Sequence, residues 1–380
     1  MIDQTLTSFL LKNCQLIDGI SDSIRENVDI FIEGERIIEI GNRLSGIRPV
    51  KELDLSGHTV LPGLIDTHVH LAFDASDDPV GHLLEESDYI TLIKMVINCK
   101  DQLLHGVTTI RDLGAPADLI IALRTALEQE ILVGPRLVVS GEVITTKGGH
   151  CYYIGHEATC KQEAVDAVKE ELRKGVDVIK VMASGGSLTP GSSVHIPQFS
   201  IDEIEAIVQT AHQKGIKVAA HANALAGIKN AVKSGVDSIE HGSYTDDETL
   251  ELMRNLGTWL VPTMSPAEIL LNSPHINEKR RNDITRNWKS RKAVVEKAIK
   301  MGIKMASGTD AGVTFTPHGC VSIEIELFRQ LGMEPMQAIW TATCWAADLL
   351  GISDHVGIIA EGKYADLIAV EGNPLNNLKL

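Results

Sequence analysis

The sequence predicts an α/β protein in which a (β/α)8 barrel of the TIM type carries a small β-sandwich built from both chain ends. Three observations support this fold. The 380 residues suit one large barrel plus a small appendage, because α/β barrels reach about 250 residues as one domain. A helix–glycine–strand unit recurs through the middle of the chain, and both ends instead show short strands broken by turn residues.

The barrel is predicted over residues 59–355 because the same unit recurs there: an amphipathic helix, a glycine, then a short apolar strand. Glycine suits a helix C-terminus because it enters the left-handed region without a Cβ penalty. The strands are apolar nearly throughout, as in parallel strands buried on both faces. Seven units contain the glycines Gly106, Gly134, Gly175, Gly215, Gly235, Gly257 and Gly302. A further strand at 59–71 makes eight, and a doubly wound open sheet is the alternative.

Other segments of the barrel region have local signals of their own. Ser200 and Glu203 form a predicted capping box at a helix start. The charged stretch 265–300 predicts a long helical or mobile excursion after the seventh strand, and 335–351 predicts the helix that closes the barrel. The four tryptophans are predicted to pack in the core or between helices: Trp259, Trp288, Trp340 and Trp345.

The small sandwich is predicted from residues 1–58 together with 356–380. Both ranges read as short strands separated by glycine, asparagine and proline.

Composition narrows the class of protein. The chain has 35 basic and 51 acidic residues and a net charge of −16, which argues against nucleic-acid or anionic-membrane partners. No apolar run approaches the 18 residues of a membrane span, and the N-terminal segment lacks the basic region of a signal peptide. None of the six cysteines forms a C-x-x-C pair, so a reduced chain in the cytoplasm is expected.

Metal-binding residues follow the predicted strands at matching positions. The first strand ends in His68 and His70, whose side chains point the same way because residues alternate along a strand. Four later strands carry Lys180, His221, His241 and Asp310. Each alone has an ordinary explanation: a core histidine, or, for the aspartate, a helix cap. Together at the C-terminal ends of barrel strands, where barrel chemistry occurs, they predict a site for zinc or a similar ion.

Lys180 is the most specific of these residues, because it lies in a strand that is apolar on both sides. A buried ammonium is costly unless it is paired or neutralised, and nearby metal cations would lower its pKa. A neutral amine can react with CO₂ to form a carbamate, an anionic ligand that can bridge two metals. A structural salt bridge and a Schiff-base lysine are the alternatives.

These residues lie in motifs that resemble the amidohydrolase superfamily, and more narrowly the branch of imidazolonepropionase that contains prolidase-like dipeptidases. The matching segments are VLPGLIDTHVHL, HGVTTIRDLG, TTKGGH, VIKVMASGG, KVAAHAN, SIEHGS, SGTDAG and GKYADLIAVEGNPL. The resemblance implies two divalent metal ions. His68, His70 and Asp310 would hold one ion, His221 and His241 the other, and carboxylated Lys180 would bridge them. Relatives usually continue with further strands past GNPL, where this sequence ends at residue 380.

The site so predicted indicates an enzyme that hydrolyses an amide or peptide C–N bond of a small molecule, such as a dipeptide or an N-acyl amino acid. A metal-bridging hydroxide would attack the carbonyl, and Asp310 would move its proton to the leaving amine. The candidate substrate-binding residues are His150, Arg111, Tyr244, Asn223 and His318. For Arg111, a structural ion pair with Asp112 or Asp66 is the alternative. His195 and the loop at 185–187 are candidates for a mobile cover.

Two other functions compete with this interpretation. A mononuclear deaminase or cyclic-amide (imidazolone) hydrolase would use one metal and an unmodified Lys180. A non-catalytic binding protein is disfavoured because all six ligand positions are filled. A homo-oligomer is a further expectation, since such barrels often associate.

Overall fold

The computed structural model describes residues 8–274 and 276–376. Its larger part is an α/β structure with parallel strands, as expected, and these strands form two sheets. One sheet contains β6 (Leu64–Val69), β7 (Val107–Asp112) and β8 (Arg136–Val139). The other has the order β10 (Gly155–Ala158), β9 (Val143–Thr146), β11 (Val178–Met182), β12 (Lys217–Ala222), β13 (Ser238–His241) and β14 (Trp259–Val261).

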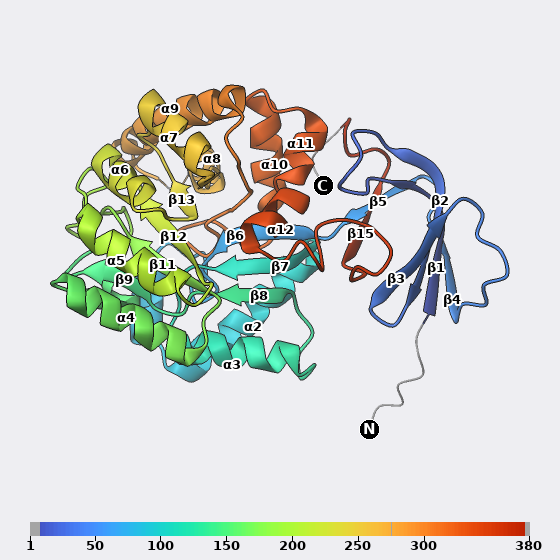
Figure 1. Ribbon diagram of the computed structural model, residues 1–380, viewed down its shortest axis with the longest axis horizontal. Helices are drawn as coiled ribbons and strands as arrows, with labels where there is room; N and C mark the ends of the chain where they lie inside the picture. The colour runs from blue at the N-terminus through green and yellow to red at the C-terminus, as the bar shows by residue number, and fades with distance from the viewer. Residues whose placement is uncertain (1–7, 275, 377–380) are drawn as a thin grey trace.

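Helices surround these strands (Figure 1). In chain order they are α1 (Pro79–Glu85), α2 (Asp88–Leu104), α3 (Ala117–Glu128), η1 (Tyr152–Ile154), α4 (Lys161–Lys174), α5 (Ile201–His212), α6 (Leu225–Lys233), α7 (Asp247–Leu256), α8 (Ser265–Asn272), α9 (Glu278–Met301), α10 (Val321–Gln330), α11 (Pro335–Trp340) and α12 (Cys344–Leu350). The capping box of Ser200 and Glu203 is present at α5. α4, α7 and α9 end at left-handed glycines, as the repeat predicts.

The predicted eighth strand forms only isolated bridges. Leu260 bridges Met305 and Val69 bridges Ala311, both in parallel. Residues 303–311 therefore connect β14 to β6, and a backbone hydrogen bond of 2.8 Å from Asp177 to Val139 connects the two sheets. No closed eight-stranded ring is assigned within the described ranges. Asp310 has φ +55°, a left-handed conformation that interrupts an extended strand.

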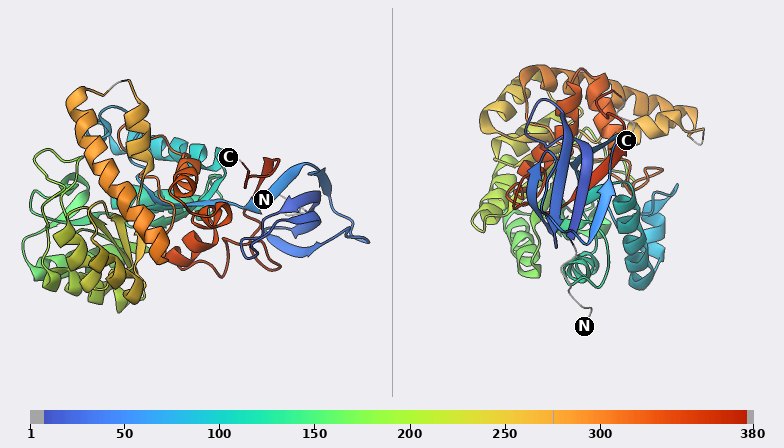
Figure 2. Two further views of the ribbon diagram at one scale, coloured as in Figure 1. Left: turned by 90° about the horizontal axis from the view of Figure 1, so that it is seen from above. Right: turned by 90° about the vertical axis from the view of Figure 1, so that its right-hand side faces the viewer.

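The chain ends meet in one six-stranded sheet beside the parallel sheets (Figures 1 and 2). It contains β1 (Ser8–Leu16), β2 (Arg25–Glu33), β3 (Arg36–Gly41), β4 (Lys51–Asp54), β5 (His58–Pro62) and β15 (Leu367–Glu371). β15 pairs antiparallel with β5, which joins the two termini. One sheet is assigned here, and residues 1–7 and 377–380 lie outside the described ranges, so the sandwich stays a prediction.

The predicted strand at 59–71 is two strands that meet at Gly63. β5 belongs to the terminal sheet and β6 to the parallel sheet. A Cβ at position 63 would lie 2.2 Å from Oγ1 of Thr108, so the chain can pass only without a side chain. This crossing places the His68–His70 end of β6 inside the larger part of the molecule.

Candidate functional site

A cavity of about 530 Å³ opens where the parallel strands end. Its inner wall holds polar side chains from several strands: His68, His70, His150, Lys180, His221, Asn223, His241 and Asp310. All six predicted metal ligands are in this set. The cavity has the size of a typical small-molecule site.

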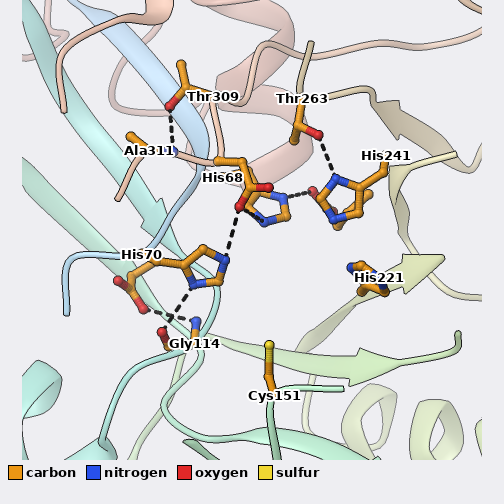
Figure 3. A network of polar contacts seen from close by, with 12 residues as sticks. His68, His70, Gly114, Cys151, His221, His241, Thr263, Thr309 and Ala311 are labelled. Atoms are coloured by element: carbon orange, nitrogen blue, oxygen red, sulfur yellow. Dashed lines mark hydrogen bonds and ion pairs between the residues drawn. The ribbon is translucent and has the colours of Figure 1, made fainter. Parts of the chain in front are cut away.

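His68 and His70 both face Asp310. Their Nε2 atoms lie 3.5 and 3.3 Å from Oδ1 of Asp310. Nδ1 of His68 is 2.7 Å from a carboxylate oxygen of Glu240. Nδ1 of His70 is 3.2 Å from the carbonyl of Gly114 (Figure 3). Burial lowers the pKa of His68 to about 4, so its imidazole is neutral and can ligate a metal.

His221 and His241 continue the same wall. Their ring centroids are 4.6 Å apart, and the His241 ring is 5.1 Å from that of His68. Nε2 of His221 lies 3.1 Å from the carbonyl of Gly185, and Nδ1 of His241 lies 2.6 Å from the hydroxyl of Thr263. Burial lowers the pKa of both imidazoles well below the usual value. Both are therefore neutral.

Lys180 is the buried lysine that the sequence indicates. Its side chain comes from the middle of β11 and is 1% exposed. Within residues 8–274 and 276–376, its ammonium makes no hydrogen bond or ion pair. Burial lowers its pKa to about 8, although Glu240 and Asp310 act in the opposite direction. Such an amine reaches the neutral, nucleophilic form at a lower pH than an exposed lysine.

Two of the predicted ligands have strained backbones. His241 has φ +70° and Asp310 has φ +55°, a region that non-glycine residues seldom adopt. Each of these residues comes where an extended segment ends, and the turned backbone sets the direction of its side chain. Such strain is concentrated at functional sites.

The donor set fits a bound metal. One ligand atom from each of His68, His241 and Asp310 lies within 4.8 Å of the others. Each of the four histidines uses one ring nitrogen on a protein oxygen and keeps the other available, which is the usual arrangement around metal-binding histidines. Neutral imidazoles and a carboxylate are ligands that zinc and similar ions prefer.

The five predicted substrate-binding residues divide into two groups. His150 and Asn223 line the cavity, and the His150 ring is 4.5 Å from that of His221. Tyr244 is outside the cavity lining, and its hydroxyl donates to Oδ1 of Asn287. His318 is buried, with Nε2 3.2 Å from the carbonyl of Phe73. The structure therefore does not bring Tyr244 and His318 to the cavity.

Arg111 is also buried away from the cavity. Its guanidinium donates to the carbonyl of Thr67 at 2.6 Å and to Oε1 of Glu240 at 3.0 Å. Arg111 therefore forms a structural ion pair, as the alternative prediction proposed, but with Glu240 in place of Asp112 or Asp66. The sequence prediction did not include Glu240, because it singled out only His241 in this strand. The available signal was an acidic residue inside a predicted barrel strand, where a buried charge needs a partner.

A second group of cavity residues also escaped the sequence prediction. The stretch 265–300 forms α8 and α9, and these helices contribute much of the outer wall: Pro266, Ala267, Leu270, Arg280, Asp283, Ile284, Asn287, Trp288 and Arg291. Nε of Arg291 donates to Ser243 Oγ at 3.0 Å, and Nη1 donates to the Thr263 carbonyl at 2.6 Å. Its Nη2 makes no hydrogen bond within the described part of the chain. Trp288, predicted as core, is both buried and part of the wall.

Two other acidic and histidine clusters already contain lysine. His156 lies 2.8 Å from both Glu142 and Glu171, and Lys174 also pairs with both carboxylates. A similar cluster pairs Asp74 with His82 and Lys94. In each cluster a lysine ammonium already pairs with the carboxylates that a metal ion would need, so we assign both clusters to ion-pair networks.

Comparisons with known proteins find relatives that cover nearly the whole chain. The amidohydrolase family profile matches residues 59–380. The ochratoxinase of Aspergillus niger is 30% identical over 405 residues, covering 96% of this chain and 81% of that protein. The crystal structure of a Xaa-Pro dipeptidase with bound methionine in the active site has a TM-score of 0.89 and 34% identity, covering 98% and 95% of the two chains. A prolidase complexed with N-methylphosphonate-L-proline has a TM-score of 0.89 and 29% identity, covering 98% and 94%.

These matches confirm the resemblance that the motifs predicted, including its prolidase-like members. Within residues 8–274 and 276–376, no helix is long and apolar enough to cross a membrane.

Proposed function

The chain belongs to the amidohydrolase family, and from this premise we propose that it is a binuclear metal-dependent hydrolase of a small amide. The substrate class is a dipeptide or an N-acyl amino acid, cleaved at its C–N bond as in a prolidase. The proposal also takes the two parallel sheets and residues 303–311 as one TIM-like barrel.

One observation carries the proposal. Six metal-competent side chains from five separate segments of the chain line one cavity: His68, His70, Lys180, His221, His241 and Asp310. One related protein is named for its action on ochratoxin, and two related structures are a Xaa-Pro dipeptidase and a prolidase. A buried lysine without an ion pair in this set favours a carboxylated, bridging ligand.

The ligands are assigned as follows in this proposal. His68, His70 and Asp310 would hold one divalent ion, His221 and His241 would hold the second, and carboxylated Lys180 would be a ligand shared by the two. Zinc suits these nitrogen and oxygen ligands. When bound, the ions supply Lewis-acid polarisation of the scissile carbonyl and lower the pKa of water to near neutrality.

Asp310 is the proposed proton carrier. Burial acts to raise its pKa, but the contacts with His68 and His70 outweigh burial and lower it, so the carboxyl is ionised and has an oxygen that can accept a proton. Its side chain faces the cavity between these two histidines. In the proposed reaction it takes the proton of the attacking water and passes it to the departing nitrogen, which leaves as an amine.

Arg291 is the proposed anchor for a substrate carboxylate. Ser243 and Thr263 hold its guanidinium in the cavity wall, and Nη2 is available for a ligand. A fixed guanidinium recognises a carboxylate well because its donors form a planar fork. Leu270, Ile284 and Trp288 in the same wall favour an apolar side chain on that substrate.

Elemental analysis and a substrate panel test the proposal together. Protein from cells supplied with zinc and bicarbonate, purified without chelator, should contain about two metal equivalents per chain. It should release amine from Xaa-Pro dipeptides or N-acyl amino acids, and a chelator should abolish this activity. About one equivalent, with ammonia release or ring opening of a cyclic amide, would support the mononuclear alternative instead. Absence of both metal and hydrolysis would refute the proposal.

We also propose that the protein acts in the cytoplasm. The described chain contains six free cysteines, Cys14, Cys99, Cys151, Cys160, Cys320 and Cys344, as expected of a reducing compartment. Fractionation of the source cells tests this location.

A further inference from the structure

The helix α2 presents an aliphatic stripe to solvent. Ile90, Ile93, Ile97 and Leu104 are between 46% and 70% exposed, and their spacing places them on one side of the helix. Met95, Cys99 and Gln102 on the opposite side are buried against the body of the molecule. α2 therefore has two apolar faces, and only one of them is covered within the described part of the chain.

Further exposed apolar side chains extend this surface. Leu84 of α1 is 60% exposed just before α2 begins. α3 packs beside α2, and the loop after α3 exposes Ile131 and Val133. Large exposed apolar areas are uncommon on soluble monomers and commonly mark interaction sites. A stable dimer buries about 800 Å² per partner, more than one helix offers, so these neighbours matter.

The charges on α2 indicate which partner covers the stripe. Asp88, the first residue of α2, and Glu85, the last residue of α1, are exposed beside its N-terminal end, and Lys100 is exposed near its C-terminal end, within the stripe. Within residues 8–274 and 276–376, none of these three side chains forms an ion pair. Two copies of α2 packed antiparallel would place the acidic end of each beside Lys100 of the other. A parallel arrangement would bring like charges together.

We propose that α2 is the centre of a two-fold symmetric interface between two copies of this chain, with the helices antiparallel and the axis near Ile93. In a two-fold interface the same patch serves both subunits, so it must complement itself. The stripe meets this requirement because isoleucines flank its middle and opposite charges lie at its two ends. The acidic end disfavours an anionic membrane surface as the partner.

Sedimentation velocity of the full chain over a range of protein concentrations tests this interface. Wild-type protein should sediment as a dimer, or as a multiple of one, and Ile93→Glu should halve that mass. The matched control is Ile20→Glu, an equally exposed isoleucine in the loop after β1, which should keep the wild-type mass. Circular dichroism of each variant verifies that it is folded.

A charge exchange gives a second, independent measurement. Lys100→Glu should raise the dimer dissociation constant about tenfold, and adding Asp88→Lys should recover most of the loss. The interface is refuted if wild-type protein is monomeric throughout the range, or if Ile93→Glu keeps the wild-type mass. Binding of monomeric protein to vesicles of phosphatidylcholine and phosphatidylglycerol would refute it in favour of a membrane surface.

Discussion

The carboxylate of Glu240 lies 2.7 Å from Nδ1 of His68, and both side chains are almost completely buried. The same carboxylate pairs with Arg111 at 3.0 Å. Burial acts to raise the pKa of Glu240, but Arg111 and His68 lower it to about 2. This ionised carboxylate fixes the ring orientation of His68, so that Nε2 faces Asp310.

Glu240→Gln should therefore weaken metal binding and catalysis although Glu240 is not a proposed ligand. The amide cannot balance the charge of Arg111 or accept from His68 as strongly. We expect a loss of about 10- to 100-fold in kcat/KM and in metal affinity. Metal titration of the chelator-treated protein measures the affinity. Glu251→Gln, an exposed residue of α7, is the control, and equal losses in the two variants would contradict this role.

Lys180→Ala should remove the proposed bridging carbamate. We expect about one metal equivalent in place of two and a fall in kcat of several orders of magnitude. Short carboxylic acids such as formate or acetate should restore part of the activity, because they can supply a carboxylate in the vacated space. The exposed Lys214→Ala is the control. A variant that keeps two metals and wild-type activity would overturn the bridging role.

Arg291→Gln should discriminate between substrates with and without a free carboxylate. A hydrogen bond between charged groups is worth about 1.5–3 kcal/mol, so we expect KM for the acid to rise roughly 10- to 100-fold. KM for the matching C-terminal amide should change much less, and kcat should change little for either. Arg286→Gln, which is exposed on the same helix, is the control. Parallel changes for the acid and the amide would indicate that Arg291 only supports the wall.

His156 should make stability depend on pH. Glu142 and Glu171 raise its pKa to about 9 from an ordinary value of 6.5. The folded state then binds the proton more tightly than the unfolded state. The contribution of protonated His156 to the free energy of unfolding is therefore complete below pH 6.5 and is lost as pH rises through 9. The loss is at most about 1.4 kcal/mol per pH unit.

Denaturant unfolding at pH 6, 8 and 10 measures this contribution. His156→Asn should be about 2–3 kcal/mol less stable than wild type at pH 6, and the difference should shrink toward pH 10. His355→Asn, an exposed histidine outside the network, should show no such trend. A difference that stays constant with pH would show that the network does not depend on a charged His156.

The helix–glycine–strand repeat was sufficient to predict the α/β fold and the cavity position of all six candidate ligands. Parallel strands have their C-terminal ends at the same edge of the sheet. Residues that follow the glycine of each unit by a similar number of positions therefore lie near one another. Lys180 and His221 are placed by this local rule alone, and His68 and His70 by the alternation of side chains along the strand predicted at 59–71. The rule is weaker for the terminal sheet, where β5 pairs with a strand about 300 residues away in sequence.

The tertiary structure decided the contacts that cross the molecule. The sequence left Arg111 between a substrate contact and an ion pair with Asp112 or Asp66, but its guanidinium reaches Glu240 of β13. Arg291 lay in a stretch predicted only as an excursion, and α9 folds back so that it lines the cavity. Local periodicity states which face of a strand or helix is buried. It does not state which distant element meets that face, because that choice depends on the packing of the whole chain.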